Sequence, residues 1–127
     1  MSGVKVSFLG YKYPLLFPLT QIELASDVSV NVADARDIGC MKISSISSRG
    51  SRRDFIDLYA LTRTYPLSEM LTLFDRKYSG TPYNRIHLLK SLAYFADAET
   101  EPMPDLLVPV EWNDVKEYFL SEVKKIF

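Results

Sequence analysis

The chain has little cysteine, little glycine and no excess of either charge. Of its 127 residues, only Cys40 is a cysteine and five are glycines. A single cysteine excludes an internal disulfide and is typical of proteins in a reducing compartment. The formal net charge is −1, from 15 basic and 16 acidic residues. Binding to a nucleic acid or a membrane surface would therefore need a local cluster of basic residues rather than the charge of the whole chain.

Long apolar runs are also missing. No segment approaches the roughly 20 apolar residues that a membrane-spanning helix needs, and no apolar run behind basic residues marks a leader at the N-terminus. Hydrophobic residues still make up 47% of the chain, which is enough for a packed core. We therefore expect a cytoplasmic protein with no membrane contact, in which residues 1–127 form one domain.

Short strands are predicted in residues 1–33. Val4–Leu9 alternates apolar and polar residues, as a half-buried strand does. Gln21–Leu24 and Val28–Val32 also alternate, and they predict a hairpin that turns at Ser26–Asp27. The prolines between the first and second of these segments exclude a helix there.

Helices are predicted in residues 34–127. The first should begin after Asp34, whose carboxylate can cap free backbone amides, and should end at Gly50 in a left-handed exit. The second expected helix runs from the cap Ser51 to about Tyr65, the third from Leu67 to Tyr78, and the fourth from a Thr81-Pro82 cap to about Phe95. The last is amphipathic, and the apolar residues on one of its sides are Trp112, Val115, Phe119, Val123 and Ile126. The expected fold class is α+β, with a small, mostly antiparallel sheet of two to four short strands followed by a bundle of about five helices.

The first predicted helix has two distinct faces. Helical spacing places Lys42, Ser45 and Arg49 on one stripe, where a serine beside cations leaves room for an anion such as a phosphate. The same spacing places Gly39, Ile43 and Ile46 on a face that should pack closely against a neighbouring element. A solvated stripe with one lysine and one arginine is the alternative, and spacing alone favours it.

The second predicted helix carries two aspartates, Asp54 and Asp57, among apolar residues on nearly every side. Carboxylates at the edge of a core need partners, and the basic candidates are Lys42, Arg49, Arg52 and Arg53. The aspartates would then pin the turn between the two helices. Alternatively, one of them positions a catalytic or phosphate-binding cation, or acts as a general base.

His87 and Cys40 do not suggest a metal site. His87 is the only histidine, and no second histidine or cysteine accompanies it as a zinc ligand. Cys40 lies beside the predicted packing face and is better explained as part of the core than as a nucleophile. The sequence also contains no glycine-rich phosphate loop and no Gly-x-Ser-x-Gly elbow.

The segment from Asp37 to Asp57 resembles the distal motif of the AbiEii-type nucleotidyltransferases. These are the toxins of type IV abortive-infection toxin–antitoxin pairs, in the DNA polymerase β-like superfamily. The motif places an aspartate, a lysine, an arginine and an Asp-x-x-Asp pair beside the nucleotide site, and the matching residues are Asp37, Lys42, Arg49, Asp54 and Asp57. The resemblance extends through Tyr13-Pro14, Lys77-Tyr78, residues 94–99 and residues 112–119. We therefore take Lys42, Asp54 and Asp57 as the candidate catalytic residues, and Ser45, Arg49, Arg52 and Arg53 as the candidate phosphate-binding residues.

The metal-binding half of that family pattern is missing. No Gly-Ser followed by an Asp-x-Asp pair stands upstream of Leu9, and Ser7 occupies the middle of the strand where related enzymes can carry a further acidic residue. The chain thus resembles the C-terminal half of such an enzyme. The resemblance implies that Mg²⁺ and a nucleoside triphosphate would bind only to a complete site.

Three functional hypotheses follow. In the first, the chain is a truncated, split or degenerate AbiEii-like protein that is inactive alone and works in a toxin–antitoxin or phage-defence context. An antitoxin protein is then a possible partner, and RNA is a partner only if the chain is active. In the second, it is a non-catalytic module that associates with itself or with a catalytic half through its N-terminal strand. The third, weaker hypothesis is a small enzyme of another class with Asp54 or Asp57 as its base.

Overall fold

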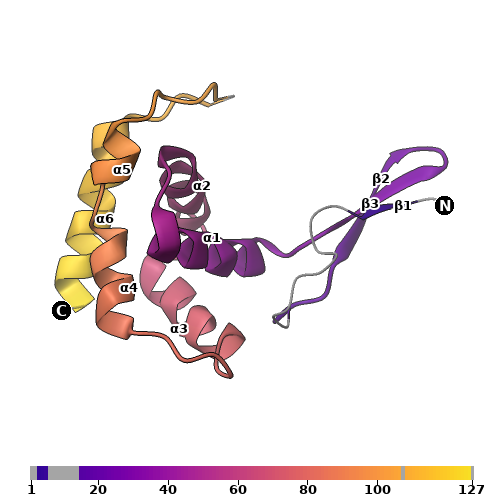
Figure 1. The fold of residues 1–127 in the computed structure, drawn as a ribbon. Coiled ribbons are helices and arrows are strands. Elements are labelled where there is room, and N and C mark those ends of the chain that lie inside the picture. The colour runs from indigo at the N-terminus through magenta and orange to yellow at the C-terminus, as the bar shows by residue number, and fades with distance from the viewer. Residues whose placement is uncertain (1–2, 6–14, 107, 127) are drawn as a thin grey trace.

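The computed structural model describes residues 3–5, 15–106 and 108–126 and has the expected α+β class (Figure 1). A small sheet is followed along the chain by helices. The elements are β1 (Gly3–Lys5), β2 (Thr20–Ala25), β3 (Val28–Val32), α1 (Ala35–Arg49), α2 (Arg52–Thr62), α3 (Leu67–Lys77), α4 (Arg85–Leu92), the single turn α5 (Ala96–Glu99) and α6 (Trp112–Ile126).

The sheet has the strand order β1-β3-β2. β2 and β3 form the predicted antiparallel hairpin, with Ile22 opposite Val30 and a register shift between Glu23 and Ala25. β1 pairs with the other edge of β3 in parallel. The predicted strand Val4–Leu9 is described only at its first two residues, because residues 6–9 lie outside the described part of the chain.

Helix α1 begins and packs as its sequence predicts. The Asp34 side chain caps it by accepting a hydrogen bond from the Arg36 amide at 2.9 Å. Gly39 is buried on the packing face, and a Cβ atom there would stand 2.5 Å from Cε of Met70 in α3. The absence of a side chain at Gly39 therefore lets α3 approach α1 closely. Ile43 and Ile46 complete this face, and both are buried.

The turn between α1 and α2 corrects one prediction. Gly50 has φ −79° and ψ 105°, so the predicted left-handed exit is wrong. Glycine is needed here for space instead, because a Cβ atom would stand 2.7 Å from the Phe55 ring. Ser51 caps α2 as predicted, by accepting from the Asp54 amide at 3.0 Å. Helix α2 ends at Thr62, three residues before the expected end.

The predicted start of the fourth helix is also wrong. It does not begin at Thr81-Pro82, because the Thr81 amide closes a turn by donating to the Tyr78 carbonyl. Asn84 is the actual cap, and its side-chain oxygen accepts from the His87 amide at 3.0 Å. Helix α4 then ends at Leu92 rather than near Phe95, and the separate turn α5 follows.

The core lies among the helices. Phe55 stands at the centre of an aromatic cluster, with ring centroids 5.1 Å from Phe95, 6.1 Å from Trp112 and 5.5 Å from Phe119. Helix α6 presents the predicted apolar side to this core, with Trp112, Val115, Phe119 and Val123 buried and Ile126 partly buried. None of the helices in the described ranges is both long and apolar enough to cross a bilayer.

A buried ion pair joins α1, α3 and the segment before the hairpin. The Lys77 ammonium lies 2.9 Å from Oδ1 of Asp37, and both side chains have no solvent exposure. The same carboxylate accepts hydrogen bonds from the backbone amides of Leu16 and Phe17, each at 3.0 Å. Both oxygens of Asp37 are therefore satisfied inside the protein, as a buried charge requires.

Substituting alanine for Gly50 should destabilise the protein by about 1–3 kcal/mol. The new methyl group would overlap the Phe55 ring, which cannot move freely because other rings surround it. The measurement is chemical unfolding followed by circular dichroism. Gly80→Ala is the matched control, since a Cβ atom at Gly80 would have no neighbour within 4 Å. Equal stability losses in the two variants would contradict the explanation that Gly50 is needed to leave space for the Phe55 ring.

Lys77→Met should lower the free energy of unfolding by about 3–5 kcal/mol, because it leaves the Asp37 carboxylate buried without a cation. The double variant Asp37→Asn/Lys77→Met should lose less than Lys77→Met alone, since it buries no charge and keeps one acceptor for the backbone amides. Urea unfolding of the wild type, both single variants and the double variant measures this coupling. A double variant that loses the sum of the two single losses would show that the pair is not coupled.

Candidate functional site

Lys42 joins α1 to α2 at the centre of the predicted site. Its Nζ atom lies 3.2 Å from Oδ1 of Asp54 and 3.1 Å from Oδ2 of Asp57. The two aspartates reach one ammonium because residues three apart share a face of a helix. Arg53 contributes a second cation, with Nε 3.2 Å from Oδ1 of Asp57. Of the basic candidates for the aspartates, the structure thus selects Lys42 and Arg53.

The electrostatics keep Lys42 charged. Partial burial lowers its pKa, but the hydrogen bonds and charges of Asp57 and Asp54 outweigh that effect and raise the pKa above its ordinary value. The side chains of Lys42, Asp54 and Asp57 keep 27%, 20% and 31% of their exposure, so solvent reaches the cluster. An ammonium has three N–H donors. Two face the carboxylates, and the third can serve another acceptor.

Ser45 and Arg49 lie on the Lys42 side of α1, and both are exposed, as predicted. Among the residues that the structure describes, the Arg49 side chain has no hydrogen bond or ion pair. With Lys42, Arg53, Asp54 and Asp57, it gives the site three cations and two carboxylates. This surface therefore carries one net positive charge and one guanidinium with its donors available to an anion.

Arg52 is not part of this cluster. Its Nε donates to the Ala98 carbonyl at 3.0 Å and its Nη2 to the Glu99 carbonyl at 3.2 Å. The guanidinium also lies over the Trp112 ring, 4.7 Å from its centroid. Neighbouring residues of a helix point about 100° apart, so Arg52 contacts α5 and α6 while Arg53 pairs with Asp57. Arg52, a candidate phosphate-binding residue in the sequence, thus directs its guanidinium to α5 and α6 and away from Lys42.

His87 and Cys40 occupy structural positions. His87 is exposed, and its Nε2 lies 3.1 Å from the Ser47 carbonyl oxygen, which connects α4 to the end of α1. Cys40 is fully buried, and burial raises the pKa of its thiol to about 12, which makes it a poor nucleophile. No group of three histidine, cysteine, aspartate or glutamate side chains suited to a metal ion occurs among the described residues.

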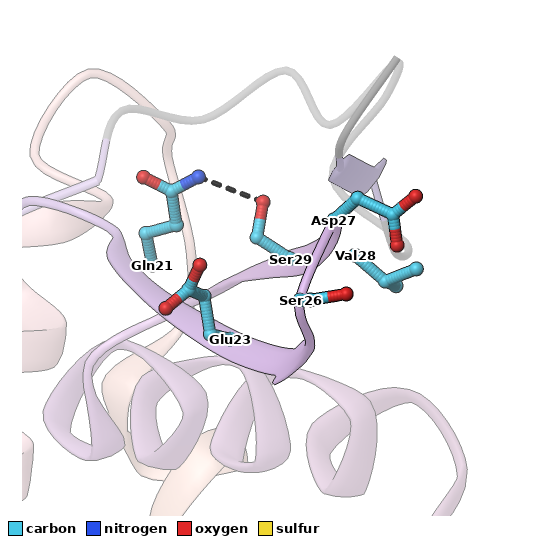
Figure 2. A pocket seen from close by; sticks show the side chains of 6 residues that line it. All are labelled: Gln21, Glu23, Ser26, Asp27, Val28 and Ser29. Atoms are coloured by element: carbon cyan, nitrogen blue, oxygen red, sulfur yellow. Dashed lines mark hydrogen bonds between the residues drawn. The ribbon is translucent and has the colours of Figure 1, made fainter.

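Three hollows in the described part of the chain lie away from Lys42. One of about 420 Å³ is on the β2–β3 hairpin and is lined by Gln21, Glu23, Ser26, Asp27, Val28 and Ser29 (Figure 2). A second, of about 110 Å³, lies between α1, α3 and α4 beside His87, and a third, of about 430 Å³, lies between α2 and the segment that leads into α6. None of them is lined by Lys42 or its two aspartates. The predicted site is thus a surface constellation separate from these hollows.

Sequence reasoning missed the buried role of Asp37 and Lys77. The resemblance placed both in matching segments, but neither was expected to be buried. One signal was present, because Lys77 follows the core residues Leu73 and Met70 by four and seven positions. That spacing places the lysine on the buried face of α3, where a charge needs a partner.

Lys42→Met should lower the free energy of unfolding by about 1 kcal/mol at pH 7, because two carboxylates lose their shared cation. Arg53→Met, which removes a more exposed pair with Asp57, should cost less than half as much. Since folding raises the pKa of Lys42, the advantage of the wild type over Lys42→Met should persist up to about pH 10 and shrink as the lysine deprotonates above it. Thermal unfolding across pH 6–11 tests this, and an advantage that grows at high pH would contradict it.

Comparison with known proteins provides one relative and no assigned activity. An uncharacterized protein of Aquifex aeolicus (strain VF5) is 38% identical over 127 residues, a match that covers 98% of this chain and 58% of the relative. The chain therefore spans somewhat more than half of the length of that protein. No protein-family model matches the chain, and no solved structure matches it.

Proposed function

We propose that the chain is the phosphate-side part of an AbiEii-related nucleotidyltransferase, truncated or split from the part that carries the metal-binding carboxylates. The observation that carries this proposal is the Lys42 ammonium, which two aspartates of α2 hold beside the exposed Ser45 and Arg49. Apart from Ser45, these are the residue types and the order of the motif that the sequence resembles. The function would belong to a cytoplasmic toxin–antitoxin or phage-defence system.

Each residue of the cluster has a distinct part in this proposal. Asp54 and Asp57 orient the Lys42 ammonium, so that its third N–H can donate to a phosphate oxygen. Arg49 supplies a planar guanidinium suited to two oxygens of a phosphate, and the Ser45 hydroxyl can donate between them. Because the raised pKa keeps Lys42 protonated at neutral pH, the lysine acts as a fixed positive charge rather than as a base.

No group of three histidine, cysteine, aspartate or glutamate side chains that could hold a metal ion occurs among the described residues. In the proposed enzyme, Mg²⁺ would orient the triphosphate and offset its charge, and its carboxylate ligands would come from a second polypeptide segment. The longer Aquifex relative is consistent with this division, since about two fifths of its length lies outside the match. We therefore expect the chain to bind nucleotide phosphates without transferring nucleotides.

A second candidate function is a non-catalytic interaction module. It is favoured by β1, which pairs with β3 on one side and leaves its other edge unpaired among the described strands. In that case the chain would associate with itself or with a separate protein, and Lys42 and its aspartates would only join α1 to α2. Nucleotide binding separates the two candidates.

Arg49→Ala should weaken ATP binding about tenfold, because it removes a charge-assisted pair of hydrogen bonds to phosphate. Isothermal titration of ATP into the purified chain at low salt measures the affinity. Arg76→Ala is the matched control, since Arg76 is also an exposed helical arginine but lies on α3. Equal affinities of the two variants, or no ATP binding by the wild type, would contradict the phosphate site.

The same preparation tests the expected lack of catalysis. Incubation with RNA, labelled nucleoside triphosphates and Mg²⁺ should give no incorporation above background. Robust incorporation that Lys42→Ala abolishes would show that the chain is a complete enzyme.

A further inference from the structure

The hollow between α1, α3 and α4 has an aromatic surface that the fold holds in place. Phe74, Tyr78 and Leu88 line it and are buried. The Phe74 ring centroid lies 4.5 Å from that of Tyr78 and 5.0 Å from that of Tyr83. Tyr83 also lines the hollow and is 38% exposed, and its hydroxyl donates to Asp75 of α3. The outermost ring is therefore fixed by a hydrogen bond before any ligand arrives.

Several polar groups of the lining are not used by the fold. The Ser44 and Thr81 hydroxyls and the Asn84 amide nitrogen have no hydrogen-bond partner among the residues that the structure describes. The Nε2 atom of His87 lies 3.1 Å from the Ser47 carbonyl oxygen. Because a carbonyl can only accept, Nε2 carries the proton, and Nδ1 is an acceptor in the neutral imidazole. The hollow thus offers hydrogen-bond donors and one acceptor beside an aromatic surface.

Charge and size restrict what the hollow can hold. None of its described lining residues is an aspartate, glutamate, lysine or arginine, so an ion would find no acidic or strongly basic partner there. An apolar cavity of about 150 Å³ holds one benzene molecule. This hollow is smaller, at about 110 Å³, but it opens to solvent beside the exposed Tyr83, Asn84 and His87. It has room for one six-membered ring and not for two fused rings.

We propose that this hollow binds a neutral, planar six-membered ring with carbonyl oxygens and an N–H group on its edge, which is the chemistry of a pyrimidine base. The ring would pack against Phe74 and Tyr83, as aromatic rings do. Its carbonyl oxygens would accept from the Ser44 and Thr81 hydroxyls, and its N–H would donate to Nδ1 of His87.

The ring site is separate from the Lys42 cluster. Ser44 and Ser47 follow Lys42 on α1 by two and five positions, so helical geometry turns them about 140–160° away from it. Different faces of α1 therefore carry the two sites, and the ring site goes beyond the proposed phosphate site. A failure of ATP binding, or of its dependence on Arg49, would leave the ring site unchanged.

The test is a titration of the isotope-labelled chain with uracil, followed by NMR of the backbone amides. Saturable shifts are expected at residues 44–47 and 81–88, with a dissociation constant of about 1 mM, as is reasonable for so small a ligand. Adenine should bind about tenfold more weakly or worse, because its second ring would clash with the lining. The absence of saturable shifts with uracil, or equal affinities for uracil and adenine, would overturn the proposal.

Ser44→Leu should weaken uracil binding about tenfold or more, because the larger side chain fills the hollow. Ser48→Leu is the matched control, since Ser48 is an exposed serine of the same helix and does not line the hollow. Tyr83→Ala removes one aromatic wall at an exposed position, so it decides the question if Ser44→Leu disturbs α1. Circular dichroism checks that each variant is folded. Folded Ser44→Leu or Tyr83→Ala protein that binds uracil as well as Ser48→Leu does would overturn the proposal.

Discussion

The carboxylate of Asp37 is the point on which the arrangement of this protein depends. It accepts two backbone amides from the segment before the hairpin and one ammonium from the end of α3. Burial of Asp37 and Lys77 removes the hydration of both charges, so the pair is stable only while each partner stays in place. Two segments distant in sequence are thereby fixed to α1 by a single side chain.

Helix α1 consequently has two faces with different contacts. Its Gly39, Ile43 and Ile46 face is fixed by close contact with α3 and the core. A face turned away from this contact presents Lys42 to the aspartates of α2. Because the buried side cannot rotate without opening the core, the position of the Lys42 ammonium is set by packing. A site built on such a helix is preorganised by the fold rather than by the site residues alone.

The features that the sequence predicted correctly are those that depend on residues close together in the chain. The caps at Asp34 and Ser51, the hairpin and the buried side of α6 follow from patterns within a few residues, and the structure confirms them. The errors came from distant contacts. The role of Gly50 depends on the Phe55 ring and its aromatic neighbours. Arg52 and Arg53 look alike in sequence, and only the positions of α5 and α6 separate them.

The hairpin and the Lys42 cluster are connected through α1. Asp37, which holds the segment leading into the hairpin, precedes Lys42 by five residues, or about 7.5 Å along a helix. The buried carboxylate thus fixes both the segment that leads into the hairpin and the helix from which Lys42 extends toward the aspartates of α2.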